Sequence, residues 1–254
     1  MTNKKLEGKK AIVTGSSSGM GAEIAARFAA EGADVWAVGG GNLEALNETI
    51  KRCTASGVRS YGKGYDFSKS EQGSIAVEDG VKFLGGLDIL VNCAGTRNFK
   101  PILEVTDDEI HTMFEVNTKS FYFSSREAVK TMAKQKSGDI LMMGSISGHR
   151  ARPERTLYCG TKAAIELLTQ CLAMELGSLG IRVNCLAPGL VSSGRVKTKI
   201  QEEKGYADRR LKGIPLGRFG DPVNIAATAV FLVSPENEFM SGSIVSVDGA
   251  SMTG

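Results

Sequence analysis

The chain has 254 residues, of which 42% are hydrophobic and 6% aromatic, and its formal net charge is +3. This length is enough for a sizeable core in one large domain or two small ones. The small charge argues against nucleic acid or a membrane surface as a partner, and since no run approaches about 20 apolar residues, no membrane span is expected.

Short apolar runs alternate with helical patterns from one end of the chain to the other. The runs that predict strands are 10–14, 34–38, 60–65, 88–92, 139–144, 182–187 and 244–247. Apolar residues at helical spacing lie between them, as in 22–31 and 110–132. This alternation predicts an α/β fold, a doubly wound, Rossmann-type parallel sheet with helices on both faces. Because we find no repeat or linker, we expect a single domain over residues 1–254.

Residues with strong positional preferences mark several helix ends. Thr106 and Glu109 form a capping-box pattern, and Asp221 followed by Pro222 predicts a helix start. Gly32 lies where a helix is expected to stop. These signals support the helical assignments.

The helix expected over 163–176 is apolar on most sides. Such a helix is either central to a fold or covered by another subunit, and the second is favoured at the edge of a doubly wound sheet. We therefore predict a homo-oligomer, taken as a tetramer with a dimer left open.

The cysteines and the N-terminus bear on the cellular compartment. The cysteines are odd in number and show no metal-ligand spacing, so we expect reduced thiols and no metal site: Cys53, Cys93, Cys159, Cys171 and Cys185. No apolar segment long enough for a signal peptide follows the lysine-rich segment 1–10. These observations predict a cytoplasmic protein.

The first expected strand runs directly into a glycine-rich loop that precedes a helix. Gly15 permits a tight turn, and Gly19 and Gly21 let backbone N–H groups approach a pyrophosphate at the helix N-terminus. The spacing is Gly-x-x-x-Gly-x-Gly rather than Gly-x-Gly-x-x-Gly. The loop predicts a nucleotide site.

The same loop also matches Gly-x-Ser-x-Gly, the nucleophile elbow of α/β hydrolases. That chemistry needs a histidine base late in the chain, after an acid. Only His111 and His149 exist, and more than a hundred residues follow the second. An elbow on the first strand is also early, so a hydrolase is the less favoured alternative.

Tyr158 and Lys162 are four residues apart and follow Ser145. In a helix these two positions share a face, so an ammonium lies beside a phenol, and its charge favours phenolate and lowers the phenol's pKa. Such a tyrosine exchanges a proton with an alcohol or carbonyl oxygen. Amphipathic helices also produce this pair by chance, so its weight comes from the nucleotide site that precedes it.

Taken together, these motifs resemble the short-chain dehydrogenase/reductase family, in its shorter-subunit branch. The residues that carry the resemblance are the loop at 14–21, the turn Asn92-Cys93-Ala94-Gly95, Asn117, Ser145, Tyr158, Lys162 and Pro188-Gly189. Further matches at 6–9, 215–218 and 241–249 extend it over nearly the whole chain. The resemblance implies an oxidoreductase that transfers a hydride between NAD(P) and a secondary alcohol or carbonyl compound.

The resemblance implies catalytic roles for four residues. Tyr158 would be the general acid in reduction and the general base in oxidation. Lys162 would lower the pKa of Tyr158 and hold the cofactor ribose. Ser145 would hydrogen-bond the substrate oxygen. Asn117 would anchor a water that links Lys162 to solvent, unless it is only a polar residue tolerated in a helix.

The resemblance also implies the cofactor contacts. Asn92 would line the cofactor and brace the central strand, Asp66 would contact the adenine amino group, and 188–191 would face the nicotinamide carboxamide. Ser193 keeps a hydroxyl where the family usually has threonine, and Cys93 replaces a usual asparagine. The expected contacts are Gly15, Ser17, Ser18, Gly19, Met20, Gly39, Gly40, Asp66, Phe67, Asn92, Ala94, Gly95, Tyr158, Lys162, Pro188, Gly189, Val191 and Ser193.

The end of the second strand decides between NAD and NADP, because an acidic residue there binds the ribose 2′-hydroxyl and a basic one accepts a 2′-phosphate. Gly39 and Gly40 occupy these positions, so both determinants are missing. With no carboxylate to repel a 2′-phosphate, NADP is favoured over NAD. The other interpretation is a flexible turn with weak discrimination.

Several cations lie near the expected catalytic residues. Arg152 and Arg155 precede Tyr158, and Arg97 follows the turn at 92–95. Such cations could clamp a carboxylate or phosphate of the substrate, and the alternative is that they point to water. We hypothesise that Arg152 or Arg155 contacts an anionic substrate. His149 either touches substrate or lies on the surface.

In the family, the substrate lies under the segment that follows the Pro-Gly pair, so 190–214 is interpreted as a lid within the single domain. The family acts on 3-oxoacyl thioesters, sugars, sugar acids, steroids, polyols and small ketones, and the variable lid sets the choice. The alternative from another class is a non-catalytic regulator that binds NAD(P). The intact set of Ser145, Tyr158 and Lys162 argues against it.

Overall fold

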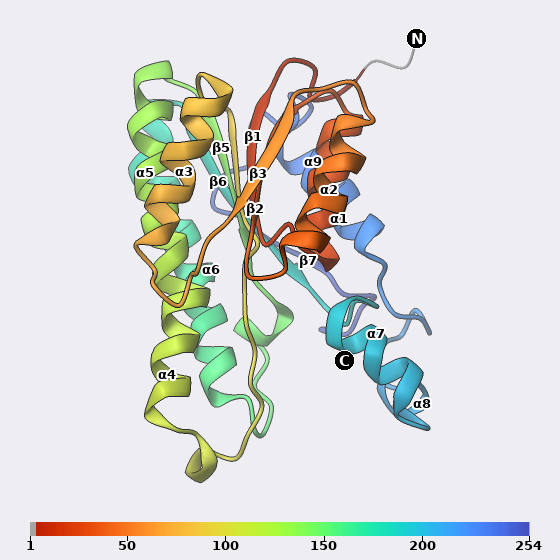
Figure 1. Cartoon of the computed structure of the whole chain (residues 1–254). Helices are drawn as coiled ribbons and strands as arrows, with labels where there is room; N and C mark the ends of the chain where they lie inside the picture. The colour runs from red at the N-terminus through yellow and green to blue at the C-terminus, as the bar shows by residue number, and fades with distance from the viewer. Residues whose placement is uncertain (1–3, 254) are drawn as a thin grey trace.

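Seven strands form one parallel sheet in residues 4–253, which the computed structural model describes apart from the side chain of Arg195 (Figure 1). The strands are β1 (Lys10–Thr14), β2 (Asp34–Gly39), β3 (Ser60–Gly64), β4 (Ile89–Asn92), β5 (Gly138–Met143), β6 (Ile181–Pro188) and β7 (Ile244–Val247). They lie in the order β3-β2-β1-β4-β5-β6-β7, and every neighbouring pair is parallel. The predicted doubly wound parallel sheet is confirmed.

Helices cover both faces of the sheet, so the central strands are buried on both sides. The helices are α1 (Gly19–Ala30), α2 (Leu43–Thr54), α3 (Gln72–Leu84), α4 (Asp107–Phe114), α5 (Ser120–Gln135), α6 (Thr156–Leu176), α7 (Gly194–Glu202), α8 (Tyr206–Leu211) and α9 (Pro222–Val233). Figure 1 shows α1, α2 and α9 on one face and α3, α5 and α6 on the other.

Strand β1 illustrates how the two-residue period of a strand divides the core. Val13 packs with Phe28 of α1 and Ile225 of α9, whereas Ile12 belongs to the cluster on the opposite face, with Phe121 of α5. All five side chains are fully buried or nearly so. Alternate residues of one short apolar strand therefore anchor both helical layers.

The expected helix ends agree with the structure. The Thr106 hydroxyl accepts from the Glu109 N–H at 3.3 Å, and the Glu109 carboxylate accepts from the Thr106 N–H at 3.0 Å. Asp221 caps α9 and Pro222 is its first residue. Gly32 follows α1 in a left-handed conformation, with φ of 97°.

The helix expected over 110–132 is interrupted by one wider turn. Between α4 and α5, Glu115–Lys119 forms a π-helix that contains the buried Asn117. Such turns occur frequently at functional sites, because they change which side chains and backbone groups face a neighbouring element. Here the wider turn lies beside the end of β4 and α6.

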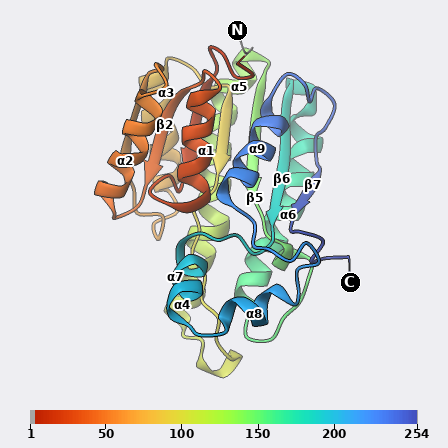
Figure 2. The same ribbon diagram turned by 90° about the vertical axis from the view of Figure 1, so that its right-hand side faces the viewer.

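The segment 190–214, in which the sequence shows no clear pattern, contains the two short helices α7 and α8. They project beyond the carboxyl ends of the strands (Figure 2), on the opposite side of the molecule from α4 in the view of Figure 1. Val191, Val196 and Ile214 are buried, with 5%, 5% and 4% of their surface exposed, and anchor this segment. The segment expected to be the lid is therefore partly helical, with few buried apolar side chains.

Helix α6 is less buried than its composition suggests. Leu167 and Met174 are 62% and 88% exposed, so the chain itself leaves part of the apolar surface of α6 uncovered. No helix within the described residues has both the length and the apolar character needed to cross a bilayer.

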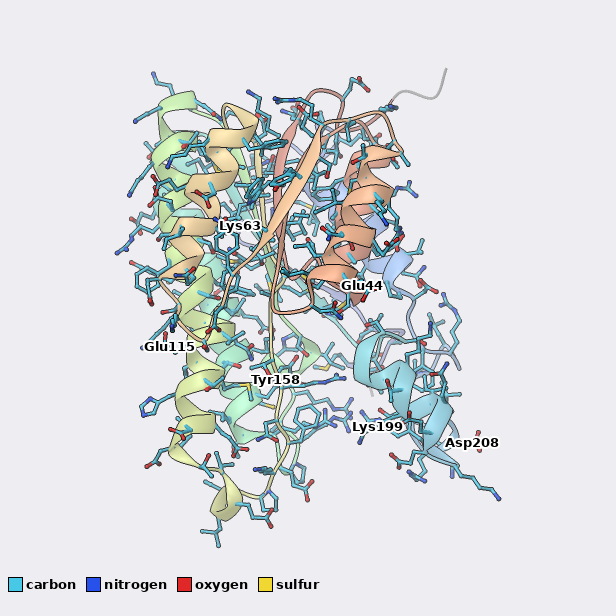
Figure 3. The ribbon with its side chains drawn as sticks, in the orientation of Figure 1. Glu44, Lys63, Glu115, Tyr158, Lys199 and Asp208 are labelled. Carbon is cyan, nitrogen blue, oxygen red and sulfur yellow. The ribbon has the colours of Figure 1, made fainter. Side chains whose placement is uncertain are left out.

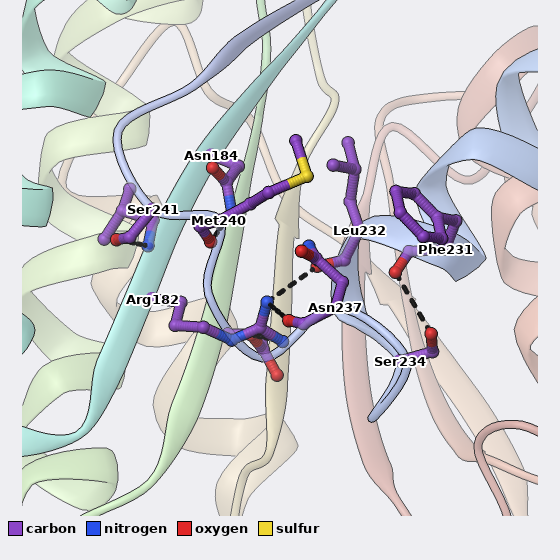
Figure 4. Close-up of polar contacts among 10 residues, drawn as sticks. Arg182, Asn184, Phe231, Leu232, Ser234, Asn237, Met240 and Ser241 are labelled. Atoms are coloured by element: carbon purple, nitrogen blue, oxygen red, sulfur yellow. Dashed lines mark hydrogen bonds and ion pairs between the residues drawn. The ribbon is translucent and has the colours of Figure 1, made fainter.

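A polar network fastens the end of α9 to the sheet (Figure 4). The Arg182 guanidinium of β6 donates to the backbone carbonyls of Leu232, at 3.3 Å, and Asn237. It also lies 2.6 Å from the Asp139 carboxylate of β5. Burial raises the pKa of Asp139 to about 7 despite the nearby Arg182 charge, so this network contains an acid that titrates near neutrality.

Candidate active site

The strand order reverses between β1 and β4, and the loops that follow these two strands diverge there. In doubly wound sheets this point is where ligands bind. A cleft of about 1400 Å³ opens at this edge and extends under α7 and α8. Figure 3 shows Tyr158 and Lys199 of α7 on opposite sides of this region, and both line the cleft.

Most residues singled out from the sequence line this one cleft, although they come from seven separate segments. They are Gly15, Ser17, Ser18, Gly19, Met20, Gly39, Gly40, Asp66, Phe67, Ala94, Gly95, Ser145, Tyr158, Lys162, Pro188, Gly189, Val191 and Ser193. Arg97, Arg152 and Arg155 line it as well. Asn92 and Asn117 do not.

The glycine loop is shaped so that only backbone lines its floor. A Cβ atom on Gly15, whose φ is 74°, would lie 2.9 Å from the backbone nitrogen of Ala94, and one on Gly21 would lie 2.3 Å from the Gly15 carbonyl oxygen. Ser18 precedes α1 without a side-chain capping bond. The first N–H groups of α1 therefore face the cleft without a side-chain cap, as a pyrophosphate site requires.

The turn after β4 is tied to the end of β1 by Thr14, whose role the sequence did not reveal. The Thr14 hydroxyl accepts from the N–H groups of Cys93 and Ala94, at 2.9 and 3.1 Å. Burial raises the pKa of the Cys93 thiol to about 12. The residue that replaces the family's usual asparagine is therefore a neutral thiol.

The far end of the cleft, after β2 and β3, combines glycines and polar groups with the side chains of Leu43 and Phe67. The Ser17 hydroxyl accepts from the Gly40 N–H at 3.3 Å, and a Cβ on Gly39 would lie 2.4 Å from that hydroxyl oxygen. Asp66 accepts from the Ser68 hydroxyl and N–H, at 2.6 and 3.0 Å, and the hydroxyl bond is the main cause that lowers the pKa of Asp66. Asp66 is thus an ionised group at the cleft edge.

Ser145, Tyr158 and Lys162 meet where β5 ends and α6 begins. The buried Lys162 ammonium donates to the Met143 carbonyl at 2.7 Å and lies 5.9 Å from the centre of the Tyr158 ring. The Ser145 hydroxyl accepts from the Ser147 N–H at 3.1 Å, which leaves its own proton available for donation. The Tyr158 and Phe99 rings pack in a T-shaped arrangement, with ring centres 5.6 Å apart.

The Asn117 side chain bonds to two neighbouring segments. Its side-chain oxygen accepts from the Thr96 N–H, and its side-chain nitrogen donates to the Thr96 carbonyl, both at 2.8 Å. The same nitrogen lies 3.2 Å from the hydroxyl of Thr161, the residue before Lys162. The amide thus joins the chain after β4 to α6.

Two of the residues considered from the sequence, Asn92 and His149, are not among those that line the cleft. Asn92 fastens β4 to α5, because its amide contacts Ser124 at 2.6 Å and Ser125 at 3.0 Å; it braces the strand, as expected, but its side chain faces away from the cleft. His149 lies 2.9 Å from the Glu166 carboxylate and does not line the cleft, so the structure does not support a substrate contact.

The hydrolase alternative lacks its base. Neither His111 nor His149 lines the cleft that Ser17 shares. The sequence did not single out three further cleft residues from distant segments, namely Phe99, Tyr206 and Ser251. Arg150, Lys199 and Arg210 line the cleft too; the sequence places them in cationic segments near the expected site, but no local signal relates Arg210 to Arg150.

Comparison with known proteins identifies the family of the chain. The family model described as enoyl-(acyl carrier protein) reductase matches residues 15–250. The 3-oxoacyl-[acyl-carrier-protein] reductase of Chlamydia trachomatis is 35% identical, over 96% of this chain and 97% of that protein. The 4-formylbenzenesulfonate dehydrogenase of Comamonas testosteroni is 38% identical, over 94% and 96%.

Solved structures give the same result. A short-chain dehydrogenase from Burkholderia cenocepacia in complex with NADP has a TM-score of 0.90 and 31% identity, over 97% of this chain and 99% of that one. A 7α-hydroxysteroid dehydrogenase complexed with NADH and 7-oxo glycochenodeoxycholic acid has a TM-score of 0.91 and 33% identity, over 97% and 95%. The chain belongs to the short-chain dehydrogenase/reductase family and is an oxidoreductase.

Proposed function

We propose that Tyr158 is the general acid and base with which this chain interconverts a small carbonyl compound and its secondary alcohol. The chain is an NAD(P)-dependent oxidoreductase that acts on CH–OH or carbonyl groups. One observation carries the proposal for Tyr158: Ser145, Tyr158 and Lys162 line the same cleft as the glycine loop.

When bound, the cofactor supplies the hydride in reduction and accepts it in oxidation. In reduction the Tyr158 hydroxyl gives its proton to the carbonyl oxygen, and in oxidation its oxygen takes the proton back. The Ser145 hydroxyl donates to the same oxygen and stabilises the developing alkoxide. Lys162 uses one N–H on Met143 and keeps others for the cofactor ribose, while Asn117 keeps the neighbouring segments in position.

We propose a preference for NADP over NAD. The support is the uncharged end of β2, where Gly40 and Gly41 have open space around them. An acidic side chain at Gly39, which would select NAD, would crowd Ser17. Turnover at equal concentrations of NADH and NADPH tests this preference, and a strong preference for NADH would contradict it.

We also propose a cytoplasmic homo-oligomer, taken as a tetramer. The exposed apolar residues of α6, Leu167 and Met174, support a subunit contact. No disulfide joins any of the cysteines in the described residues, which suits a reducing compartment.

The substrate is a small molecule, and we propose that it can be a carbonyl compound that carries a charge. The name of the C. testosteroni relative specifies a sulfonate, and the solved steroid dehydrogenase holds a bile acid. Neither compound is thereby the substrate of this chain.

NADPH and NADH oxidation over a panel of ketones tests the proposed function. We expect turnover with at least one ketone, and a loss of about 100- to 10,000-fold in kcat for Tyr158→Phe. Full activity in Tyr158→Phe would reject the mechanism. Tight cofactor binding without any turnover would instead favour the non-catalytic regulator.

A further inference from the structure

One end of the cleft, near Tyr158, is lined by an unusual concentration of arginines. Arg150, Arg152 and Arg155 come from the loop between β5 and α6, and Arg210 comes from α8 of the lid. The loop and the lid are far apart in the sequence, so the fold brings their charges to one place. Like charges that approach in a partly buried site repel one another, and this arrangement needs a compensating anion.

The protein does not supply that anion among its described residues. Arg152, Arg155 and Arg210 form no ion pair with a described carboxylate. By contrast, Lys199 and Arg209, which also line the cleft, both pair with Glu203. Glu154 lines this end too, but its carboxylate is not paired with any of these arginines.

The lowered pKa values of two of these arginines agree with their closeness to one another. Burial is the main cause that lowers the pKa of Arg152 and of Arg155, and the charge of Arg210 contributes in both cases. The Nε atom of Arg210 is buried without a hydrogen-bond partner. Arg150 differs from the others, because it donates to the Ser251 carbonyl. Three arginines thus line one part of the cleft without a carboxylate partner among the described residues.

The position of this cluster relative to Tyr158 is fixed by one aromatic ring. The Arg155 guanidinium lies 4.3 Å above the centre of the Phe99 ring, and Phe99 in turn packs against the Tyr158 ring. Arg155 is thus one ring away from the proposed acid–base group. A substrate that contacts both Tyr158 and Arg155 therefore carries its anionic group about the width of one aromatic ring away from its reacting carbon.

We propose that Arg152, Arg155 and Arg210 form a binding site for an anionic group of the substrate, a carboxylate, sulfonate or phosphate several bonds from the reacting carbonyl. This inference rests on the proposed function, since it assigns the substrate class of the same cleft. Because Arg210 belongs to the lid and the other two to the body, the bound anion also joins the lid to the body.

The test compares ketones of one shape that differ in charge. The anionic probes are 4-acetylbenzoate, 4-acetylbenzenesulfonate and 4-acetylphenyl phosphate, and the neutral probe is 4-acetylbenzamide. Calorimetry with saturating oxidised cofactor measures their dissociation constants without turnover. We expect at least one anion to bind about 10- to 100-fold tighter than the amide, as a charged hydrogen-bonded contact allows.

Variants locate the site. Arg155→Gln and Arg210→Gln should each reduce the preference for the anion about tenfold or more, and Arg155→Lys should recover part of it. Lys212→Gln removes an equal charge from an exposed position of the lid that does not line the cleft, and it should keep the wild-type preference. Binding of the amide should not change in any of them.

Two results would overturn the inference: a wild-type protein that binds none of the anions more tightly than the amide, or unchanged anion preference in both arginine-to-glutamine variants. The proposed function is judged separately. Tyr158→Phe should lose turnover and keep anion binding, so failure of the hydride-transfer mechanism and failure of the anion site give different results.

Discussion

The Lys162 ammonium donates a hydrogen bond to the backbone carbonyl of Met143, with a nitrogen–oxygen distance of 2.7 Å. This bond joins the helix that carries Tyr158 to the end of the strand that precedes Ser145. Because the ammonium is buried and its acceptor is an uncharged backbone group, its positive charge is not neutralised there. A single contact thus sets the relative position of the proposed catalytic residues and keeps a charge beside them.

Lys162→Met should separate catalysis from folding. The replacement retains length and apolar volume but removes the charge, so we expect kcat to fall about 100-fold or more while the melting temperature changes little. Steady-state kinetics and thermal melts measure both effects. Lys130→Met, at an exposed position paired with Glu127, is the control and should keep wild-type kcat. Equal activity in the two variants would contradict the role of Lys162.

Gly15→Ala should weaken cofactor binding by at least tenfold. The new methyl group would meet the backbone of Ala94 at 2.9 Å, and the φ of 74° is unfavourable for alanine. Fluorescence titration with NADPH measures the effect. The control is Gly177→Ala, at the end of α6, where φ is −57° and no atom lies within 4 Å. Undiminished NADPH affinity in Gly15→Ala would show that the loop does not hold the pyrophosphate.

Asp139→Asn should change how stability depends on pH. The folded-state pKa of Asp139 is raised to about 7 by burial, so the folded protein binds this proton more tightly than the unfolded chain. The stabilisation is therefore complete below about pH 4 and is lost as the pH rises to about 7, by up to about 1.4 kcal/mol per pH unit.

Urea unfolding at several pH values measures this dependence. Relative to the wild type, Asp139→Asn should gain stability steadily from pH 4 to pH 7, because an amide does not titrate. Asp208→Asn, at an exposed position on α8, should keep the wild-type pH dependence. A constant difference between wild type and Asp139→Asn across this range would be inconsistent with a raised pKa.

Leu167→Glu should yield a smaller species if α6 forms a subunit contact. Leu167 is 62% exposed on an apolar helix, and a charge in a buried interface is unfavourable. Light scattering after size-exclusion chromatography measures the mass. Leu103→Glu, at a residue that is 96% exposed in the turn Ile102–Glu104 before α4, should leave the mass unchanged. A wild-type monomer at all concentrations would disprove the oligomer itself.

The sequence determined the features that depend on local patterns. Apolar periodicity gave the strands within one or two residues, and caps such as Thr106 with Glu109 marked helix starts, because these patterns act through neighbouring backbone groups. The glycine loop and the Tyr158–Lys162 pair were recognisable for the same reason, because the residues within each motif are only a few positions apart in the sequence.

Tertiary structure alone decided which distant side chains meet. The sequence predicts Asn92 at the cofactor and Asn117 in catalysis, but it does not show that their side-chain amides bond to Ser124 and Thr96 inside the protein. Arg210 joins Arg155 only because the lid folds over the β5–α6 loop, and no local pattern encodes contacts between segments so far apart. A side chain's partners depend on how the layers pack, which the spacing of residues along one helix or strand does not specify.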